Sequence, residues 1–142
     1  MAIELTRALR AELVAQALDA RWHAYCPYSG FAVGAALLDK NGTIWTGVNI
    51  ENAAYGPTNC AERTAFFKAI SDGVTEFLAI AVVGGAMGEE PSGFCAPCGI
   101  CRQVMREFCA DDFEIILAKP GDTKVYTLKD LLPESFSPRN LE

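Results

Sequence analysis

Two short segments of the chain hold residues that could bind a metal ion and act on a substrate beside it. One is Cys60-Ala61-Glu62, and the other is Pro97-Cys98-Gly99-Ile100-Cys101. Cysteine thiolates are good ligands for Zn²⁺, and a set of three leaves the fourth tetrahedral position free for water, as in catalytic zinc sites. A nearby carboxylate that does not bind the metal can then move protons. The pattern predicts a hydrolytic zinc centre with Glu62 as the proton carrier and three ligands, Cys60, Cys98 and Cys101.

Each segment also has a simpler interpretation. Asn59 and Glu62 have the spacing of a capping box at the start of a helix. The pair Cys98 and Cys101 could be a redox-active C-x-x-C motif, and a buried cysteine is often only a small apolar side chain. Both segments, however, follow helix-breaking residues and begin predicted helices, where the positive end of the backbone dipole stabilises thiolates. Two motifs in this order and on such elements favour the zinc centre over either simpler interpretation.

A further cysteine complicates the choice of ligands, because Cys95-Ala96-Pro97-Cys98 is also a C-x-x-C motif. Pro97 disfavours the helical conformation at the residue before it, so Cys95 is expected on the loop that precedes the helix. Cys98 and Cys101 are neighbours on one helix face. We assign this pair to the metal and expect structural or incidental roles for the remaining cysteines, which are Cys26, Cys95 and Cys109.

Three thiolates would leave the zinc cluster with a net negative charge, which weakens the metal as a Lewis acid and keeps the pKa of its water high. Arg63, next to Glu62, is the candidate that offsets this charge. A guanidinium about 4 Å from a thiolate has a gross attraction of roughly 4 kcal/mol at an effective dielectric constant near 20. The alternative is an arginine on the solvated face of a helix.

Hydrophobic periodicity and breaker residues divide the chain into helices and strands. Asn41-Gly42 and Pro120-Gly121-Asp122 each predict a turn between antiparallel strands. The strand, helix, strand order elsewhere predicts parallel crossovers. The expected fold class is α/β, a mixed five-stranded sheet with helices on both faces. Helices are expected at residues 3–24, about 59–71, 97–109 and 128–132, and strands at 31–38, 43–50, 78–83, 114–117 and 124–127.

Length and composition limit the kind of protein further. The chain has 142 residues, 51% of them hydrophobic, which suffices for the core of one domain over residues 1–142. A formal net charge of −6 without runs of Lys or Arg disfavours nucleic acid and favours a small uncharged or cationic substrate. Residues 1–7 lack the order of a signal peptide, and no stretch of ~18 apolar residues could span a membrane. We expect a cytoplasmic protein with reduced cysteines. His23, the only histidine, is expected to pack or to lie at the surface.

Beyond these motifs, the sequence resembles the small homotetrameric, zinc-dependent cytidine deaminases over nearly its whole length. The pairing of Cys-x-Glu with Pro-Cys-x-x-Cys is an established signature of zinc-dependent nucleobase deaminases. The resemblance implies an α-β-α sandwich, one Zn²⁺ per subunit, and a homotetramer whose active sites are shared between subunits. It is carried by residues 27–36 (PYSGFAVGAA), 47–56 (GVNIENAAYG), 60–65 (CAERTA) and 97–103 (PCGICRQ), and by Leu131-Leu132-Pro133 and Phe136.

The same resemblance implies a reaction. Cytidine and deoxycytidine would be hydrolysed to uridine and deoxyuridine plus ammonia, as in pyrimidine salvage. Zinc lowers the pKa of its water toward ~7, and the resulting hydroxide would attack C4 of the pyrimidine. Glu62 would take up the proton, deliver one to N3 and later protonate the leaving amine, while the backbone at Ala61 would hold the edge of the base.

Further substrate contacts are likewise implied by the resemblance alone. Asn49 and Glu51 match residues that bind the ribose, and their side chains can form hydrogen bonds with sugar hydroxyls. Phe31 and Phe136 match residues that pack on the pyrimidine, with Phe136 supplied by another subunit. Tyr55 matches a residue donated across a subunit interface. The alternatives are solvated polar residues at strand ends and ordinary core or tail aromatics.

Other functions share parts of this pattern. Blasticidin S deaminases have the same zinc motifs, but the segment from Asn49 to Tyr55 favours a simple nucleoside pocket. Deoxycytidylate deaminases and nucleic-acid editing relatives generally have His in place of Cys60 and need positive charge for phosphate, and this chain offers neither. A non-catalytic zinc-binding module would use four ligands, Cys95 among them. A redox protein would form a reversible disulfide between Cys98 and Cys101.

Overall fold

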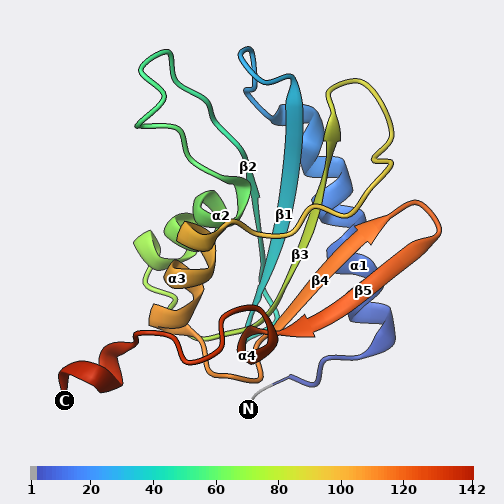
Figure 1. Ribbon diagram of the computed structural model, residues 1–142. Helices are drawn as coiled ribbons and strands as arrows, with labels where there is room; N and C mark the ends of the chain where they lie inside the picture. The colour runs from blue at the N-terminus through green and yellow to red at the C-terminus, as the bar shows by residue number, and fades with distance from the viewer. Residues whose placement is uncertain (1–2) are drawn as a thin grey trace.

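The computed structural model describes residues 3–142, which contain a mixed sheet of five strands (Figure 1). The strands are β1 (Phe31–Asp39), β2 (Ile44–Val48), β3 (Phe77–Ala86), β4 (Glu114–Lys119) and β5 (Asp122–Thr127). Their order in the sheet is β2-β1-β3-β4-β5. Only β3 and β4 pair in parallel, while β1 pairs antiparallel with β2 and with β3, and β4 with β5. The predicted sheet and both predicted hairpins are therefore confirmed.

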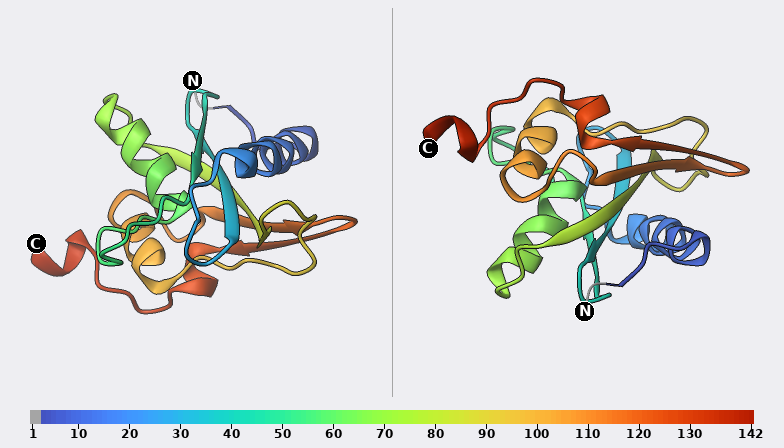
Figure 2. Two further views of the ribbon diagram at one scale, coloured as in Figure 1. Left: turned by 90° about the horizontal axis from the view of Figure 1, so that it is seen from above. Right: turned by 90° about the horizontal axis from the view of Figure 1, so that it is seen from below.

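Helices cover both faces of the sheet, which confirms the α/β class (Figure 2). On one face lies α1 (Arg7–Ala20), which is followed by the 3₁₀ turn η1 (Arg21–His23). On the other face lie α2 (Ala61–Ser71), α3 (Gly99–Phe108) and the short α4 (Leu128–Leu131), and the 3₁₀ helix η2 (Pro138–Leu141) follows in the C-terminal tail. None of the helices within residues 3–142 is long and apolar enough to cross a membrane.

The central strands β1 and β3 are buried on both faces of the sheet. Successive side chains of a strand point to opposite faces, so Leu37 and Leu38 enter different cores. Leu38 belongs to the core that also contains Leu13 of α1, whereas Leu37 belongs to the core that contains Phe66 of α2 and Met105 of α3. This packing holds α2 and α3 against the same face of the sheet.

The two crossover connections bring the first turns of α2 and α3 to one edge of the sheet. β2 and β3 both run antiparallel to β1, so they point in the same direction. α2 follows β2 and α3 follows β3, and each helix returns along the sheet from the edge where its strand ends. This edge, at the carboxyl ends of strands, is where open α/β sheets place their ligands.

Two boundaries differ from those expected in the first half of the chain. The opening helix is α1 with η1 rather than residues 3–24, because Thr6 caps it and its Oγ1 accepts a hydrogen bond from Leu9 N at 3.1 Å. The second strand ends at Val48 rather than at residue 50. The chain leaves β1 at Asn49, whose N–H still donates to Val33 O at 3.4 Å but whose O accepts a hydrogen bond from Tyr25 N at 3.0 Å.

Candidate active site

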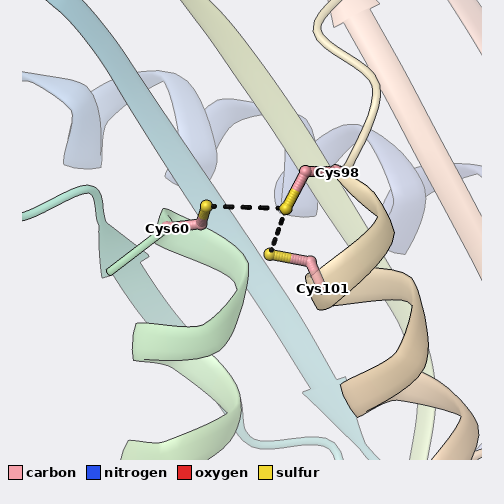
Figure 3. Close-up of side chains that lie close together, drawn as sticks. All are labelled: Cys60, Cys98 and Cys101. Atoms are coloured by element: carbon pink, nitrogen blue, oxygen red, sulfur yellow. Dashed lines mark hydrogen bonds between the residues drawn. The ribbon is translucent and has the colours of Figure 1, made fainter. Parts of the chain in front are cut away.

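Three cysteine sulfurs meet where α2 and α3 begin (Figure 3). The Sγ atom of Cys98 lies 3.8 Å from that of Cys60 and 3.5 Å from that of Cys101. All three Sγ atoms lie within 4.8 Å of one another. Zn–S bonds of about 2.3 Å in tetrahedral geometry place sulfurs roughly 3.8 Å apart, so this spacing fits one Zn²⁺. The structure thus brings together the residues that the sequence singled out as ligands, although they come from two separate helices.

Both helices begin at a cysteine of this cluster. Cys60 is the N-cap residue of α2 and Cys98 is that of α3, and neither side chain makes a capping hydrogen bond. The capping box between Asn59 and Glu62 does not form, because the N-cap of α2 is Cys60 rather than Asn59, whose amide donates to Thr64 Oγ1 at 3.1 Å. The sulfurs consequently lie at the positive ends of two helix dipoles, where negative charge is favoured.

The protons of the cluster are shared unequally. A hydrogen bond from Cys101 lowers the pKa of Cys60 to about 5, with burial opposing this and Arg63 adding to it. The same hydrogen bond raises the pKa of Cys101, where the proton stays. Thiolates are the form that binds metals, so Cys60 is already prepared to bind Zn²⁺ and the binding of the ion would release the remaining protons.

Arg63 provides a positive charge beside the sulfurs. Its Nη2 donates to Cys60 Sγ at 3.3 Å, and its Nε atom is buried without a hydrogen-bond partner among the described residues. Burial lowers the pKa of Arg63, but hydrogen bonds to Cys60 and Cys101 outweigh it, so the pKa lies above its ordinary value. The guanidinium therefore faces the thiolates, which favours the charge-balancing role over that of a solvated helix arginine.

Glu62 is the carboxyl group closest in sequence to the cluster, and it is only 4% exposed. Burial raises its pKa to about 7, and the negative charge of Cys60 adds to the rise, while backbone hydrogen bonding and Arg63 oppose it. A carboxyl group with a pKa near 7 can both take up and release a proton at neutral pH. Its position in the first turn of α2 follows from the same N-cap that places Cys60.

Asn49 and Glu51 lie at the start of the connection from β2 to α2, and both are already hydrogen-bonded. Asn49, 9% exposed, donates from Nδ2 to Phe31 O at 2.8 Å and accepts from Val33 N at Oδ1 at 2.9 Å. Glu51 accepts from the backbone N–H groups of residues 28 and 29 at 2.9 and 3.1 Å, and from the Ser29 hydroxyl. The hydrogen bond from Ser29 is the main reason why the pKa of Glu51 is lowered. Neither residue is the merely solvated strand-end polar group that the sequence left open.

The aromatic side chains that are expected to contact the substrate or a neighbouring subunit are exposed to solvent in the single chain. Phe31 is 43%, Tyr55 71% and Phe136 58% exposed. Tyr55 contacts Tyr28 edge-on at 5.9 Å beside an open cavity of about 410 Å³ that Glu51 also lines. Phe136 lies on the C-terminal tail, where its backbone O accepts from Gln103 Nε2 at 2.9 Å, and the tail extends away from the sheet (Figure 1). Ala61 is fully buried at the start of α2.

Comparison with known proteins identifies the family. Residues 8–117 match the family model described as the cytidine and deoxycytidylate deaminase zinc-binding region. The chain belongs to this family. The match includes both cysteine segments and the whole sheet up to β4, so the cluster at the start of α2 and α3 is a zinc-binding region by family as well as by geometry.

Individual members of the family are similar over almost the full length. A cytidine deaminase of Sporosarcina psychrophila is 52% identical over 131 residues, which are 92% of this chain and 93% of that protein. The crystal structure of a cytidine deaminase from Burkholderia pseudomallei superimposes with a TM-score of 0.82 at 47% identity, covering 93% of this chain and 100% of that one. A blasticidin-S deaminase of Bacillus cereus is 31% identical over 108 residues, 74% of this chain and 76% of that protein.

The geometry also bears on the alternatives that share the cysteine motifs. Among residues 3–142, the group of side chains placed to hold a metal contains Cys60, Cys98 and Cys101 but not Cys95. A three-sulfur set with an open position favours a catalytic site over a four-ligand structural one.

Sequence reasoning missed the residues that hold the loop leading to Cys98. The side chain of Arg21 is buried, and its guanidinium donates to four backbone carbonyls, those of Ala32, Gly85, Ala86 and Glu89, at 2.9 to 3.2 Å. At the other end of the loop Arg102 Nε donates to Pro97 O at 2.7 Å. Cys98 is the N-cap, so Pro97 still belongs to the loop, and α3 begins at Gly99 rather than at Pro97, where the sequence predicted its start. No local signal marks Arg21, since its partners are distant in sequence. His23 lies exposed, as expected.

Proposed function

We propose that the chain is a zinc-dependent cytidine deaminase that hydrolyses cytidine and deoxycytidine to uridine and deoxyuridine plus ammonia, a step of pyrimidine salvage. The observation that carries the proposal is the cluster of three sulfurs, spaced for one Zn²⁺, on the same helix turns as a buried carboxyl group with a pKa near 7. The similarity to cytidine deaminases over more than nine-tenths of the chain supports it.

In this proposal Cys60, Cys98 and Cys101 hold the ion and Arg63 offsets the negative charge of their sulfurs. When bound, Zn²⁺ supplies Lewis acidity that brings the pKa of water toward ~7. The contact from Arg63 Nη2 to Cys60 Sγ matters because three thiolates donate much electron density to the metal and would otherwise weaken that acidity. The role of Arg63 is to keep the site acidic enough to activate water near neutral pH.

Glu62 carries the protons. It takes one proton from the attacking water and delivers it to N3 of the pyrimidine as the C4–O bond forms. It then takes the proton of the new C4 hydroxyl and delivers it to the amine as the C4–N bond breaks. Water and the cytosine base thus become uracil and ammonia, with every proton accounted for. Burial suits this role, because a carboxyl group with a pKa of about 7 can both take up and release a proton at neutral pH.

In this proposal the substrate binds to donors and acceptors of Asn49 and Glu51 that are not used in hydrogen bonds within the protein. The Asn49 amide has one N–H and one oxygen lone pair beyond the two bonds it makes, and Glu51 has lone pairs free on its carboxylate. These groups suit ribose hydroxyls, with Phe31 packing on the pyrimidine and the backbone at Ala61 holding the edge of the base. The carboxylate of Glu51 disfavours phosphate, so a nucleoside fits better than a nucleotide.

We further propose a homotetramer in which Tyr55 and Phe136 complete the site of a neighbouring subunit. Both side chains are largely exposed, and large exposed aromatics of this kind mark protein interfaces. The C-terminal tail that bears Phe136 projects from the domain (Figure 2), which suits a contact with a second copy. We also place the protein in the cytoplasm, because its six cysteines are free and a reducing compartment preserves them.

One experiment tests the proposed reaction. The protein is purified without chelator, its zinc per subunit is measured, and the ultraviolet change is followed with cytidine, deoxycytidine, blasticidin S and CMP. We expect about one zinc per subunit and turnover of the first two substrates. Turnover of blasticidin S alone would assign the chain to the related analogue deaminases, and turnover of CMP alone would contradict the nucleoside specificity. Absence of zinc together with full activity would overturn the mechanism.

A further inference from the structure

The backbone of Phe31 is exposed to a gap in the sheet. β1 and β2 pair in a register in which Gly34 faces Val48. Continued by the antiparallel rule, this register would place Asn49 opposite Val33 and Glu51 opposite Phe31. β2 ends at Val48, however, and although Asn49 N still donates to Val33 O at 3.4 Å, Asn49 O and Glu51 N form hydrogen bonds with Tyr25 instead. Phe31, at the start of β1, therefore lacks a strand partner on this side among the described residues.

The backbone groups of Phe31 cannot form these hydrogen bonds with β3, the strand on the other side of β1. On the β3 side, Gly30 O already accepts from Met87 N at 2.8 Å. Backbone groups of successive residues in a strand point to opposite sides, so the N–H and C=O of Phe31 point away from β3 and toward the gap. A backbone N–H or C=O group that is buried there without a hydrogen-bond partner would destabilise the protein, so the identity of its partners is important.

Side chains from the segment after β2, together with Ser29 from the turn before β1, fill the gap. Asn49 replaces a rung of the ladder, since its Oδ1 accepts from Val33 N at 2.9 Å and its Nδ2 donates to Phe31 O at 2.8 Å. Phe31 N donates to Ser29 Oγ at 3.0 Å, and that hydroxyl in turn donates to Glu51. Phe31 O is thus held directly by Asn49, and Phe31 N is held by Glu51 through the Ser29 hydroxyl. The proposed function assigns both Asn49 and Glu51 to the sugar.

We propose that Asn49 and Glu51 are positioning residues for Phe31 as well as sugar contacts, so that recognition of the sugar and packing of the base depend on one hydrogen-bonded unit. The inference rests on the proposed function. It predicts that loss of Asn49 impairs the enzyme even toward a nucleoside that offers Asn49 no ring hydroxyl. A residue that only contacts the sugar would have no such effect.

The test is a double-mutant cycle on the holoenzyme with 2′,3′-dideoxycytidine, which lacks both ring hydroxyls. Asn49→Ala should lower kcat/KM for this substrate by about tenfold or more, because Phe31 O and Val33 N lose their partners. In a Phe31→Leu background, the same change should cost less than about threefold, since two residues that act through one contact are not additive. Asn41→Ala, at the opposite end of β1, is the matched control and should leave kcat/KM for this substrate unchanged.

Two results would overturn the inference. One is an Asn49→Ala enzyme that loses activity on cytidine but matches the wild type on the dideoxy substrate. The other is a double variant in which the two losses multiply. If Asn49→Ala does not fold or bind zinc, Ser29→Ala replaces it, because it removes the partner of Phe31 N and leaves Asn49 intact; an unchanged kcat/KM for the dideoxy substrate would then contradict the inference.

Both results can be distinguished from the case in which the proposed function itself is wrong. If the protein is not a cytidine deaminase, the wild type would deaminate neither cytidine nor its dideoxy analogue. Amide hydrogen exchange of residues 29–33 then still decides the positioning role, since Asn49→Ala should reduce the protection of Val33 N, which donates to the Asn49 side chain, while Asn41→Ala should not. Unchanged protection would refute the hydrogen-bonded unit itself.

Discussion

The two ends of β1 both contain buried polar side chains, but they use them differently. At one end Asp39, 1% exposed, accepts hydrogen bonds from Asn41 N, Thr43 N and Trp45 Nε1 at 2.8 to 3.0 Å. All of these partners lie within six residues, and together they close the hairpin to β2. The carboxylate is engaged entirely by its own turn, and no exposed aromatic or cysteine accompanies it in that turn.

At the other end the polar groups join distant segments and keep hydrogen-bonding capacity in reserve. Asn49 bridges two residues of β1, and the cysteine cluster joins residues 38 positions apart. Glu62 is buried with a raised pKa, and Arg63 has a buried nitrogen without a hydrogen-bond partner in the part of the chain that the structure describes. Burial of a polar group thus does not identify a functional site by itself. A functional site is indicated by unused hydrogen-bonding capacity and by contacts between residues that are distant in the sequence.

Among substitutions that test the difference between the two ends of β1, the largest loss of activity is expected at the cysteine cluster. Cys60→Ala should abolish zinc binding and reduce deamination to background, because two sulfurs and no dipole-stabilised thiolate remain at the start of α2. Metal analysis and a steady-state assay check this. The matched control is Cys109→Ala, another partly buried cysteine, which should keep zinc. A Cys60→Ala protein with a full complement of zinc would show that the ligands are elsewhere.

Glu62→Gln should keep zinc but lower kcat by at least ~10²–10⁴-fold, the usual contribution of a positioned proton carrier. The amide has the size of the carboxyl group but cannot accept the proton. Glu107→Gln, an exposed residue of α3, is the control and should leave the rate unchanged. Rates within about threefold of the wild type in Glu62→Gln would remove this residue from the mechanism.

A smaller loss is expected at Arg63. Arg63→Ala should weaken zinc affinity or slow turnover by roughly 10–100-fold, the range typical of groups that contact metal ligands. Competition with a chelator and kcat measured at saturating zinc separate the two effects. Arg63→Lys keeps the charge without the planar donor group and should lie between the wild type and Arg63→Ala. Unchanged kinetics and zinc content in Arg63→Ala would discard the charge-balancing role.

The smallest effect on activity is expected at the opposite end of β1. Asp39→Ala leaves three donors without their acceptor and should lower the free energy of unfolding by about 2–3 kcal/mol. The kcat/KM for cytidine should stay within about twofold, because the turn lies at the far edge of the sheet. Denaturant unfolding of the zinc-loaded protein measures the first quantity. A large loss of activity without loss of stability would erase the distinction between the two ends.

The order of elements could be read from the sequence because its signals are local. Asn41-Gly42 and Pro120-Gly121 specify their turns, and the apolar runs of β1 and β3 are continuous because both faces are buried. The zinc motif was equally accessible, since Cys98 and Cys101 are close in sequence and Cys60 precedes its carboxylate by two positions. Local chemistry therefore sufficed for the sheet and for the centre of the site.

The remaining features depend on partners that are distant in the sequence. Nothing around Arg21 indicates that its guanidinium will bind carbonyls of both β1 and β3. The strand expected to reach residue 50 ends at Val48 because Asn49 turns its side chain, rather than its own carbonyl, toward β1. Likewise the start of α2 could be taken for a capping box, and only the contact between two helices directs its sulfur to a metal.

The account rests on three sulfurs holding one zinc with an open fourth position. X-ray absorption at the zinc edge of the purified, reduced protein tests this most directly. The account predicts three sulfur neighbours at about 2.3 Å and one oxygen or nitrogen neighbour at about 2.0–2.2 Å. Four sulfur neighbours, or a folded and active protein without zinc, would contradict it.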